Sequence, residues 1–528
     1  MSFRGQIAEL PLGQDGLTGT KDQVKIGLRD LIDVDSITYE SGTLRKMGGA
    51  LKYNSSAISG TPSILGGWDW FPSAATQRGV ILGDDGKIYK STDGATWGVT
   101  LKSGLTVTDP TVPVFVEGGK EAAANNRKLF IFTGRNAVQV LSADGATTAD
   151  ITSPATDWSG GNQPTLGLIH EDRLWGFGNS NDPHRAYYSL PTDHEDVAGG
   201  GTISVYPGEG ERIVGAISYL GYIIVWKFPK GIYVIDTTNP TIANWKTSRL
   251  TGEIGGVSVQ GQKTVEDGSI IFLDSSGLFY KIVPTETLGS VSIENLSELR
   301  SIGPFLREGV NLGRLDRAQS VFYPAIKEYY TTLPAQGSTT QDRRITIDLN
   351  IPQRPRFGWS ERDTNVSIWM RQDSDNILRP VIGDDAGFVY KIDEEGRSKD
   401  SAGYLGMFQG PHLDMSHLDP ILGTRRKNGR FLELIVEPRG NWNLNVDMYW
   451  DGELHETVTF NMGTTGATLG SFTLGTDALA GDQVLNKKRR ITGGGRRLSI
   501  AGRNNGDSQD FSVSKFFLHF ALGDEGLG

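Results

Sequence analysis

The residues best suited to chemistry in this sequence are a few short groups of histidines and carboxylates. His412, His417 and Asp419 form the densest group of possible metal ligands. Asp373 and Asp375, with Asn376, resemble part of a calcium loop, but the glycine and the terminal glutamate of that loop are absent. The irregular spacing of the histidine group and the missing residues of the calcium loop indicate that both segments are solvated loops. We therefore predict no metal site.

Two carboxylate pairs have the residue types of a general acid and a general base. They are Asp84-Asp85 and Asp384-Asp385, and both lie in Gly-containing turns at equivalent positions of a repeat. Aspartate at such positions accepts backbone N–H groups, so turn chemistry explains both pairs. The sequence lacks the nucleophile-elbow, phosphate-loop, zinc-protease and dinucleotide motifs. We predict no catalytic residue and no cofactor.

Composition narrows the possible classes further. The chain has 528 residues, a formal net charge of −10, 69 glycines and no cysteine, which excludes disulfides and thiolate sites. The acidic balance disfavours binding of nucleic acid by the whole surface but is compatible with a channel that repels it. The longest apolar run, 222–226, is far shorter than the roughly 20 residues of a membrane span. We expect neither a membrane span nor a secretory signal peptide.

Regular repetition is the strongest structural signal. A strand, a tight polar turn and a second strand recur seven times, beginning near residues 79, 128, 173, 222, 269, 328 and 378. A period near 50 residues with Gly/Asp turns is typical of the four-stranded blades of β-propellers. We predict an all-β protein with a propeller of about seven blades, and six or eight remain open.

A short turn supports the propeller interpretation. Ser91, Asp93, Gly94 and Trp97 resemble a shortened Asp-box, the turn of sialidase-type propellers. Asp93 can accept backbone N–H groups while Trp97 packs into the blade. We expect a structural turn without a catalytic role.

The repeat stops near residue 400. The segment 441–451 alternates apolar and polar residues, as expected for a strand with one buried face. We predict an N-terminal arm over 1–35, a propeller over 36–399 and a C-terminal antiparallel β-sandwich over 400–528. A basic stretch in the last region is interpreted as a mobile, solvated loop or as a contact for an acidic partner or nucleic acid. It contains Lys487, Lys488, Arg489, Arg490, Arg496 and Arg497.

The order of several motifs resembles the tail nozzle family of short-tailed bacteriophages. The similarity lies in residues 10–19 with 37–49, 173–179 with 183–189, 203–215 with 222–227 and 231–234, and 328–348 with Trp359 and 382–390. The resemblance implies a virion tail protein made in the bacterial cytoplasm. It further implies a homo-hexameric ring below the portal that contacts the tail adaptor and the fibre or spike proteins. Double-stranded DNA would pass through that ring during ejection.

Two other classes of function stay open. One is a propeller-type glycan-binding or glycan-cleaving receptor component of a phage, which the Asp-box-like turn and the expected sandwich suggest. Cleavage would require two facing carboxyl groups, and a sialidase would also require three converging arginines. The other is a general interaction scaffold of the WD or kelch type, although the Gly-His…Trp-Asp signature is missing.

Overall fold

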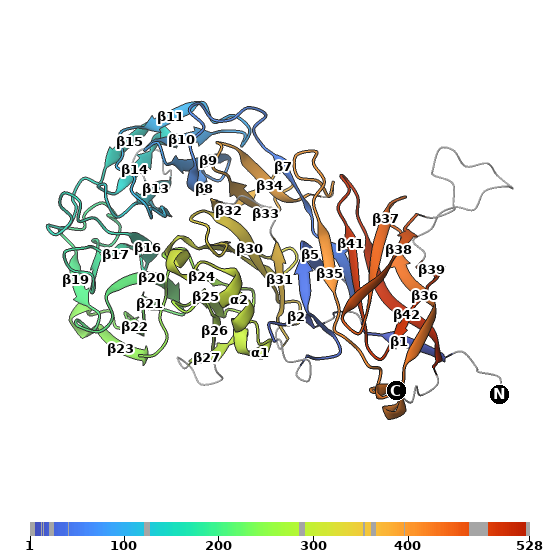
Figure 1. The fold of residues 1–528 in the computed structure, drawn as a ribbon. Helices are drawn as coiled ribbons and strands as arrows, with labels where there is room; N and C mark the ends of the chain where they lie inside the picture. The colour runs from blue at the N-terminus through green and yellow to red at the C-terminus, as the bar shows by residue number, and fades with distance from the viewer. Residues whose placement is uncertain are drawn as a thin grey trace.

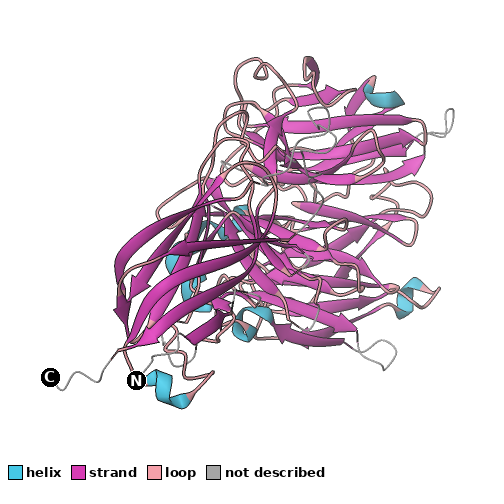
Figure 2. Ribbon diagram, turned by 90° about the vertical axis from the view of Figure 1, so that its right-hand side faces the viewer, coloured by secondary structure: helices cyan, strands magenta, loops and turns pink. Residues whose placement is uncertain are grey.

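The chain folds almost entirely as antiparallel β-sheet. In the computed structural model 52% of the residues lie in strands and 6% in helices, which confirms the all-β prediction. The structure describes residues 6–11, 13, 15–20, 26–40, 42–120, 127–284, 291–351, 354–360, 366–394, 396–463 and 484–523. The two α-helices within these ranges are α1 (Leu296–Leu299) and α2 (Gly303–Gly309). Figure 2 shows strands throughout the molecule and helices only as short segments.

Seven four-stranded antiparallel sheets account for most of the described chain between residues 49 and 394. The first sheet consists of β8 (Ile64–Ser73), β9 (Thr76–Gly83), β10 (Ile88–Ser91) and β11 (Val99–Lys102), and the second of β12 (Val114–Lys120), β13 (Arg127–Phe132), β14 (Gln139–Ser142) and β15 (Thr147–Asp150). The third sheet consists of β16 (Leu166–His170), β17 (Arg173–Phe177), β18 (Arg185–Tyr188) and β19 (Gly201–Ser204), and the fourth of β20 (Arg212–Tyr219), β21 (Tyr222–Phe228), β22 (Ile232–Asp236) and β23 (Lys246–Thr251). The strands of the other three sheets are β24 (Gln262–Thr264), β25 (Ile270–Leu273), β26 (Phe279–Pro284) and β27 (Val291–Asn295); β28 (Gln319–Tyr323), β29 (Glu328–Pro334), β30 (Gln341–Asp348) and β31 (Arg356–Ser360); β32 (Ser367–Gln372), β33 (Leu378–Gly383), β34 (Val389–Glu394) and β7 (Gly49–Lys52).

The first strands of successive sheets contact one another in a closed cycle. The contacts run from β8 through β12, β16, β20, β24 and β28 to β32, and β32 lies against β8 again. Figure 1 shows the seven sheets arranged around a common centre. The seventh sheet takes its last strand, β7, from the start of the chain, where Lys52 pairs with Tyr390. This pairing ties the two ends of the repeated region together.

The unit recognised in the sequence corresponds to the second and third strands of each sheet. β9, β13, β17, β21, β25, β29 and β33 are second strands, and a first strand precedes each of them. These inner strands have neighbours on both edges and both faces, so they are apolar over several consecutive residues. In β25, for example, Ile270, Ile271, Phe272 and Leu273 are all fully buried.

The C-terminal region forms two larger sheets that also take up strands from the N-terminal region. A seven-stranded sheet has the order β39-β36-β42-β6-β5, with β1 beside β42 and β40 beside β36, and a five-stranded sheet has the order β38-β37-β41-β35-β4. A short parallel pair, β2–β3, is separate. The bounds are β1 (Gln6–Leu10), β2 (Gly16–Leu17), β3 (Asp30–Leu31), β4 (Asp33–Asp35), β5 (Ile37–Glu40), β6 (Thr43–Lys46), β35 (Gly406–Gln409), β36 (Lys427–Glu437), β37 (Asn443–Trp450), β38 (Glu453–Asn461), β39 (Leu485–Arg490), β40 (Gly494–Gly495), β41 (Leu498–Asn504) and β42 (Ser512–Leu522).

This pairing crosses the domain boundaries expected from the sequence. β1 and β4 lie within the expected arm, and β5 and β6 lie within 36–399, yet all four pair with C-terminal strands. The two larger sheets contribute to one buried cluster, which contains Leu432 and Leu434 of β36 and Val446 and Met448 of β37. The same cluster continues into the sheets of the ring through Ile345. The two regions are therefore joined through a continuous core.

Candidate functional site

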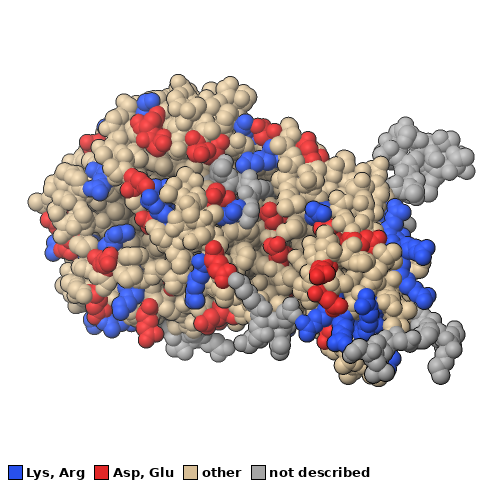
Figure 3. Space-filling view, viewed as in Figure 1, with Lys and Arg blue, Asp and Glu red and all other residues tan. Residues whose placement is uncertain are grey.

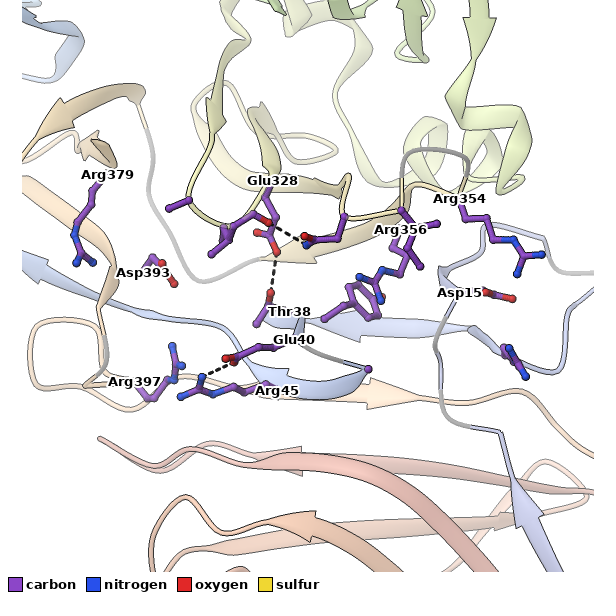
Figure 4. Close-up of a pocket in the computed structure, with 17 residues that line it drawn as sticks. Asp15, Thr38, Glu40, Arg45, Glu328, Arg354, Arg356, Arg379, Asp393 and Arg397 are labelled. Atoms are coloured by element: carbon purple, nitrogen blue, oxygen red, sulfur yellow. Dashed lines mark hydrogen bonds and ion pairs between the residues drawn. The ribbon is translucent and has the colours of Figure 1, made fainter. Parts of the chain in front are cut away.

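A large pocket lies where the ring of sheets meets the C-terminal unit. Its volume is about 790 Å³, and it is lined mainly by charged side chains (Figure 4). These are the arginines Arg29, Arg45, Arg354, Arg356, Arg379 and Arg397 and the acids Asp15, Glu40, Glu328 and Asp393. The residues come from β5, β6, β29, β31, β33, β34 and the adjoining loops, so no short stretch of sequence contains the site.

Strand alternation explains how β5 contributes to the pocket. Along this strand Ile37 and Tyr39 are buried, while Thr38 and Glu40 lie on the opposite, more accessible face. That face lines the pocket together with Arg45 of the neighbouring strand β6. A hairpin whose backbone belongs to the C-terminal sheet thus presents its polar side to the ring (Figure 4).

One carboxylate connects three segments beside the pocket. Asp510 lies before β42 and accepts hydrogen bonds from Nε and Nη2 of Arg45 at 2.9 and 2.8 Å. Nε of Arg397, which follows β34, lies 3.3 Å from the same carboxylate oxygen. Arg45 also pairs with Glu40. Asp510 and Arg397 are both buried, so loss of either partner would leave an uncompensated buried charge at the junction of the two units.

Glu328 is the most strongly perturbed acid of the pocket. It is 3% exposed, and its Oε1 accepts a hydrogen bond of 2.8 Å from the Thr38 hydroxyl. Burial, followed by the negative charge of Asp348, raises the pKa of Glu328 to about 7. Asp348 in turn pairs with Arg356, whose guanidinium lies 4.8 Å from the centre of the Tyr39 ring. At mildly acidic pH Glu328 is therefore a neutral acid amid ion pairs.

The carboxyl groups of the pocket have pKa values shifted in opposite directions. A glycosidase of the common type needs one protonated and one ionised carboxyl group. Burial raises the pKa of Glu328 and that of Asp393, whereas burial of Glu40 is outweighed by the hydrogen bond and the charge of Arg45, which lower the pKa of Glu40. Four of the arginines are engaged with carboxylates, namely Arg45, Arg356, Arg379 and Arg397.

The Asp-box-like turn follows β10 and has the expected hydrogen bonds. Oδ1 of Asp93 accepts the N–H groups of Ala95 and Thr96, each at 2.8 Å. Burial opposes ionisation, but these bonds and one from Ser91 outweigh it and lower the pKa of Asp93 to about 2. Trp97 is 5% exposed and packs between the first and seventh sheets. Gly94 has φ +80°, which accounts for glycine at that position.

The predicted basic loop is wrong in its local structure. Lys487, Lys488, Arg489 and Arg490 lie in strand β39, which pairs with β36 at the edge of the seven-stranded sheet. The error arises because an edge strand exposed on most positions lacks the apolar alternation that identifies strands. Arg496 and Arg497 follow β40, and their N–H groups bind the Asp451 carboxylate. Lys and Arg gather along this edge of the molecule in Figure 3.

The other candidate groups are turn residues. Asp373 accepts the N–H groups of Asp375 and Ile377, and Asp384 accepts those of Ala386 and Phe388. Asp84 accepts from Ser63, and Asp85 binds Lys87 and Tyr89. Asp419 caps the short 3₁₀ helix 420–423, and His412 and His417 flank Asp414, which binds Ser416. Within the described ranges no three His or acidic residues form a group that could hold a metal ion.

No motif in the sequence points to the charged pocket. Its ion pairs join residues far apart in the chain, such as Arg45 and Asp510, which are 465 positions apart. The one local signal is Glu328 itself, a charged residue at the start of a strand that is buried throughout. A charge in such a strand indicates a buried polar partner.

Comparison with known proteins does not assign a family. The sequence matches no protein-family model, and no curated protein is significantly similar to it. Within the described residues no helix is both long and apolar enough to cross a membrane.

Proposed function

We propose that this protein is a structural component of a bacteriophage tail, six copies of which form a ring through which the genome is ejected. The seven four-stranded sheets would be the blades of a seven-bladed propeller, and the two larger sheets would form a C-terminal sandwich. The observation that carries the proposal is the closed cycle of first strands completed by β7. This architecture agrees with the propeller predicted from the repeat period near 50 residues.

The junction between the two units supports a mechanical role. A closed cycle of sheets leaves few free strand edges, and the shared core with the Asp510 ion pairs joins it to the C-terminal unit. A rigid two-part subunit is what a ring requires, because a fixed rotation between head-to-tail interfaces closes the assembly. An acidic channel wall would keep DNA from adhering, and the net charge of −10 is compatible with such a wall.

In the proposed virion the ring would lie below the portal and the adaptor and would contact tail fibres or spikes. The cationic edge strand β39 is the surface we assign to an acidic neighbour in that assembly. Its residues Lys488, Arg489 and Arg490 are exposed. Double-stranded DNA would be a transient passenger of the ring and not a ligand of this strand.

A glycan-binding or glycan-cleaving receptor component is the second candidate. The specific observation in its favour is the pocket of about 790 Å³ with six arginines, a size and charge that suit an acidic sugar. Against this candidate, four of the arginines, Arg45, Arg356, Arg379 and Arg397, are already paired with carboxylates of the protein.

Copy number in purified phage particles tests the proposal. Quantitative mass spectrometry, with the portal protein as the internal reference, should give about six copies of this chain per portal ring. The chain should remain with the tails after the heads are disrupted. Copy numbers in the dozens or hundreds would instead indicate a capsid protein. Complete absence from particles would refute a virion role, and hydrolysis of host polysaccharide by the purified chain would establish the second candidate.

A further inference from the structure

A second pocket lies between the first strands of four sheets, away from the charged junction. It has a volume of about 410 Å³ and is lined by β8, β24, β28 and β32, with Pro113 and Leu378 at its margin. Figure 1 shows β8, β24 and β32 facing the centre of the ring of sheets. It shares no lining residue with the junction pocket.

Large apolar side chains form most of its wall. Trp68 and Phe71 come from β8, Phe322 from β28, and Trp369 and Met370 from β32. The indole N–H of Trp68 donates to Glu117 at 2.8 Å, which fixes the orientation of this ring. Aromatic and thioether groups of this kind provide a surface for an apolar ligand body.

The pocket contains one lysine in an unusual position. Nζ of Lys263 donates to Oε1 of Gln260 at 3.0 Å, and Gln260 is oriented by a second bond, from its Nε2 to the carbonyl oxygen of Pro113 at 3.1 Å. Among the described residues no carboxylate forms an ion pair with Lys263, and burial lowers the pKa of its amine to about 8. A cation so placed loses hydration without gaining a counter-ion.

The acid in the same wall does not supply that counter-ion. Asp69 lies 3.2 Å from a guanidinium nitrogen of Arg371 and accepts the N–H of Gln372 at 2.8 Å and the amide of Gln77. Its negative charge is already neutralised by these partners. The positive charge of Lys263 is thus available to an incoming anion.

We propose that this pocket binds a small monocarboxylate with an apolar body, such as a medium-chain fatty acid or an aromatic acid. The carboxylate pairs with Lys263, while the chain or ring packs against Trp68, Trp369 and Phe322. A single cation opposite an apolar wall matches one anionic group on an apolar molecule, whereas a polyanion or a free sugar would leave most of the wall unsatisfied. This binding role does not depend on the proposed tail function.

Titration calorimetry with decanoate tests the proposal on the full chain. We expect saturable binding at pH 7, with an affinity at least tenfold weaker for Lys263→Met. The matched control Lys87→Met, which removes an exposed lysine paired with Asp85, should bind as the wild type does. Decanol and decylamine, which have the same chain without the carboxylate, should bind at least tenfold more weakly than decanoate.

A measurement on the wild type alone covers the case in which Lys263→Met does not fold. Decanoate affinity should fall as the pH rises through 8 to 10, because Lys263 loses its charge while the ligand stays ionised. An amine-reactive acylating reagent at pH 7 should also modify Lys263 much faster than Lys87, and decanoate should protect it. Absence of saturable binding, equal binding by Lys263→Met, or equal binding of decylamine would overturn the proposal.

Discussion

Replacing Glu328 by Gln should stabilise the protein, and the gain should grow with pH. Burial and the charge of Asp348 raise the pKa of Glu328 from an ordinary 4.5 to about 7. The folded protein therefore holds the proton more tightly than the unfolded chain does. Between pH 4.5 and 7 the unfolded chain ionises first, so the contribution of Glu328 to stability falls across this window and stays constant above it.

The magnitude follows from the shift in pKa. Each unit corresponds to about 1.4 kcal/mol, so the difference in unfolding free energy between Glu328→Gln and the wild type should grow by about 3 kcal/mol from pH 4 to pH 8. Glutamine keeps an oxygen that can accept the Thr38 hydrogen bond. Other groups facing Glu328, including Asp348, Asp393 and Tyr330, are present in both proteins and largely cancel in the difference.

Thermal unfolding at half-unit pH steps is a suitable assay. If the whole chain unfolds cooperatively, about 3 kcal/mol corresponds to a rise in the relative Tm of about 3 °C. The control Glu453→Gln changes an exposed residue of β38 and should follow the wild-type pH curve. Parallel curves for Glu328→Gln and the wild type would refute the reasoning, because they would mean that Glu328 has the same pKa in the folded and unfolded states.

Two further substitutions test the turn and the junction. Trp97→Ala removes a buried indole that bonds to the Gly94 carbonyl and should cost about 3–5 kcal/mol of stability, measured by denaturant unfolding; a loss below 1 kcal/mol would contradict its packing role. Asp510→Asn leaves half-buried Arg45 and buried Arg397 without their shared carboxylate and should cost about 3 kcal/mol, because Arg45 keeps its pair with Glu40. The exposed neighbour Asp507 provides the control Asp507→Asn, and limited proteolysis should show faster cleavage near the junction only in Asp510→Asn.

The sequence identified the inner strands of the repeat but not the strands around them. β21 and β25 are buried on both faces, so their apolar runs stand out against Gly/Asp turns. First strands such as β24, with the sequence Gln-Lys-Thr, carry no comparable pattern because one edge and part of one face are open to the centre. Helix α1 and its N-cap Asn295, like the inner strands, depend on residues that are close together in the sequence.

Hydrogen bonds between residues a few positions apart could be predicted from residue types alone. The Asp93 turn spans positions 91–97, and all its hydrogen bonds are local. The same holds for Asp274, Asp373 and Asp384, whose backbone partners lie two to four positions away, whereas Asp84 accepts from Ser63, 21 positions away. These contacts depend on the types of residues a few positions apart, which can be read from the sequence.

The sequence by itself therefore determined the all-β class, the seven-fold repetition and the turn chemistry. Only the tertiary structure decided that β7 completes the seventh sheet, that N-terminal strands enter the C-terminal sheets, and that Glu328, Arg45 and Asp510 meet at one junction. The reason is physical. Local propensity and periodicity are properties of neighbouring residues, whereas strand exchange and buried ion pairs form between segments hundreds of positions apart, where burial and charge compensation depend on the assembled fold.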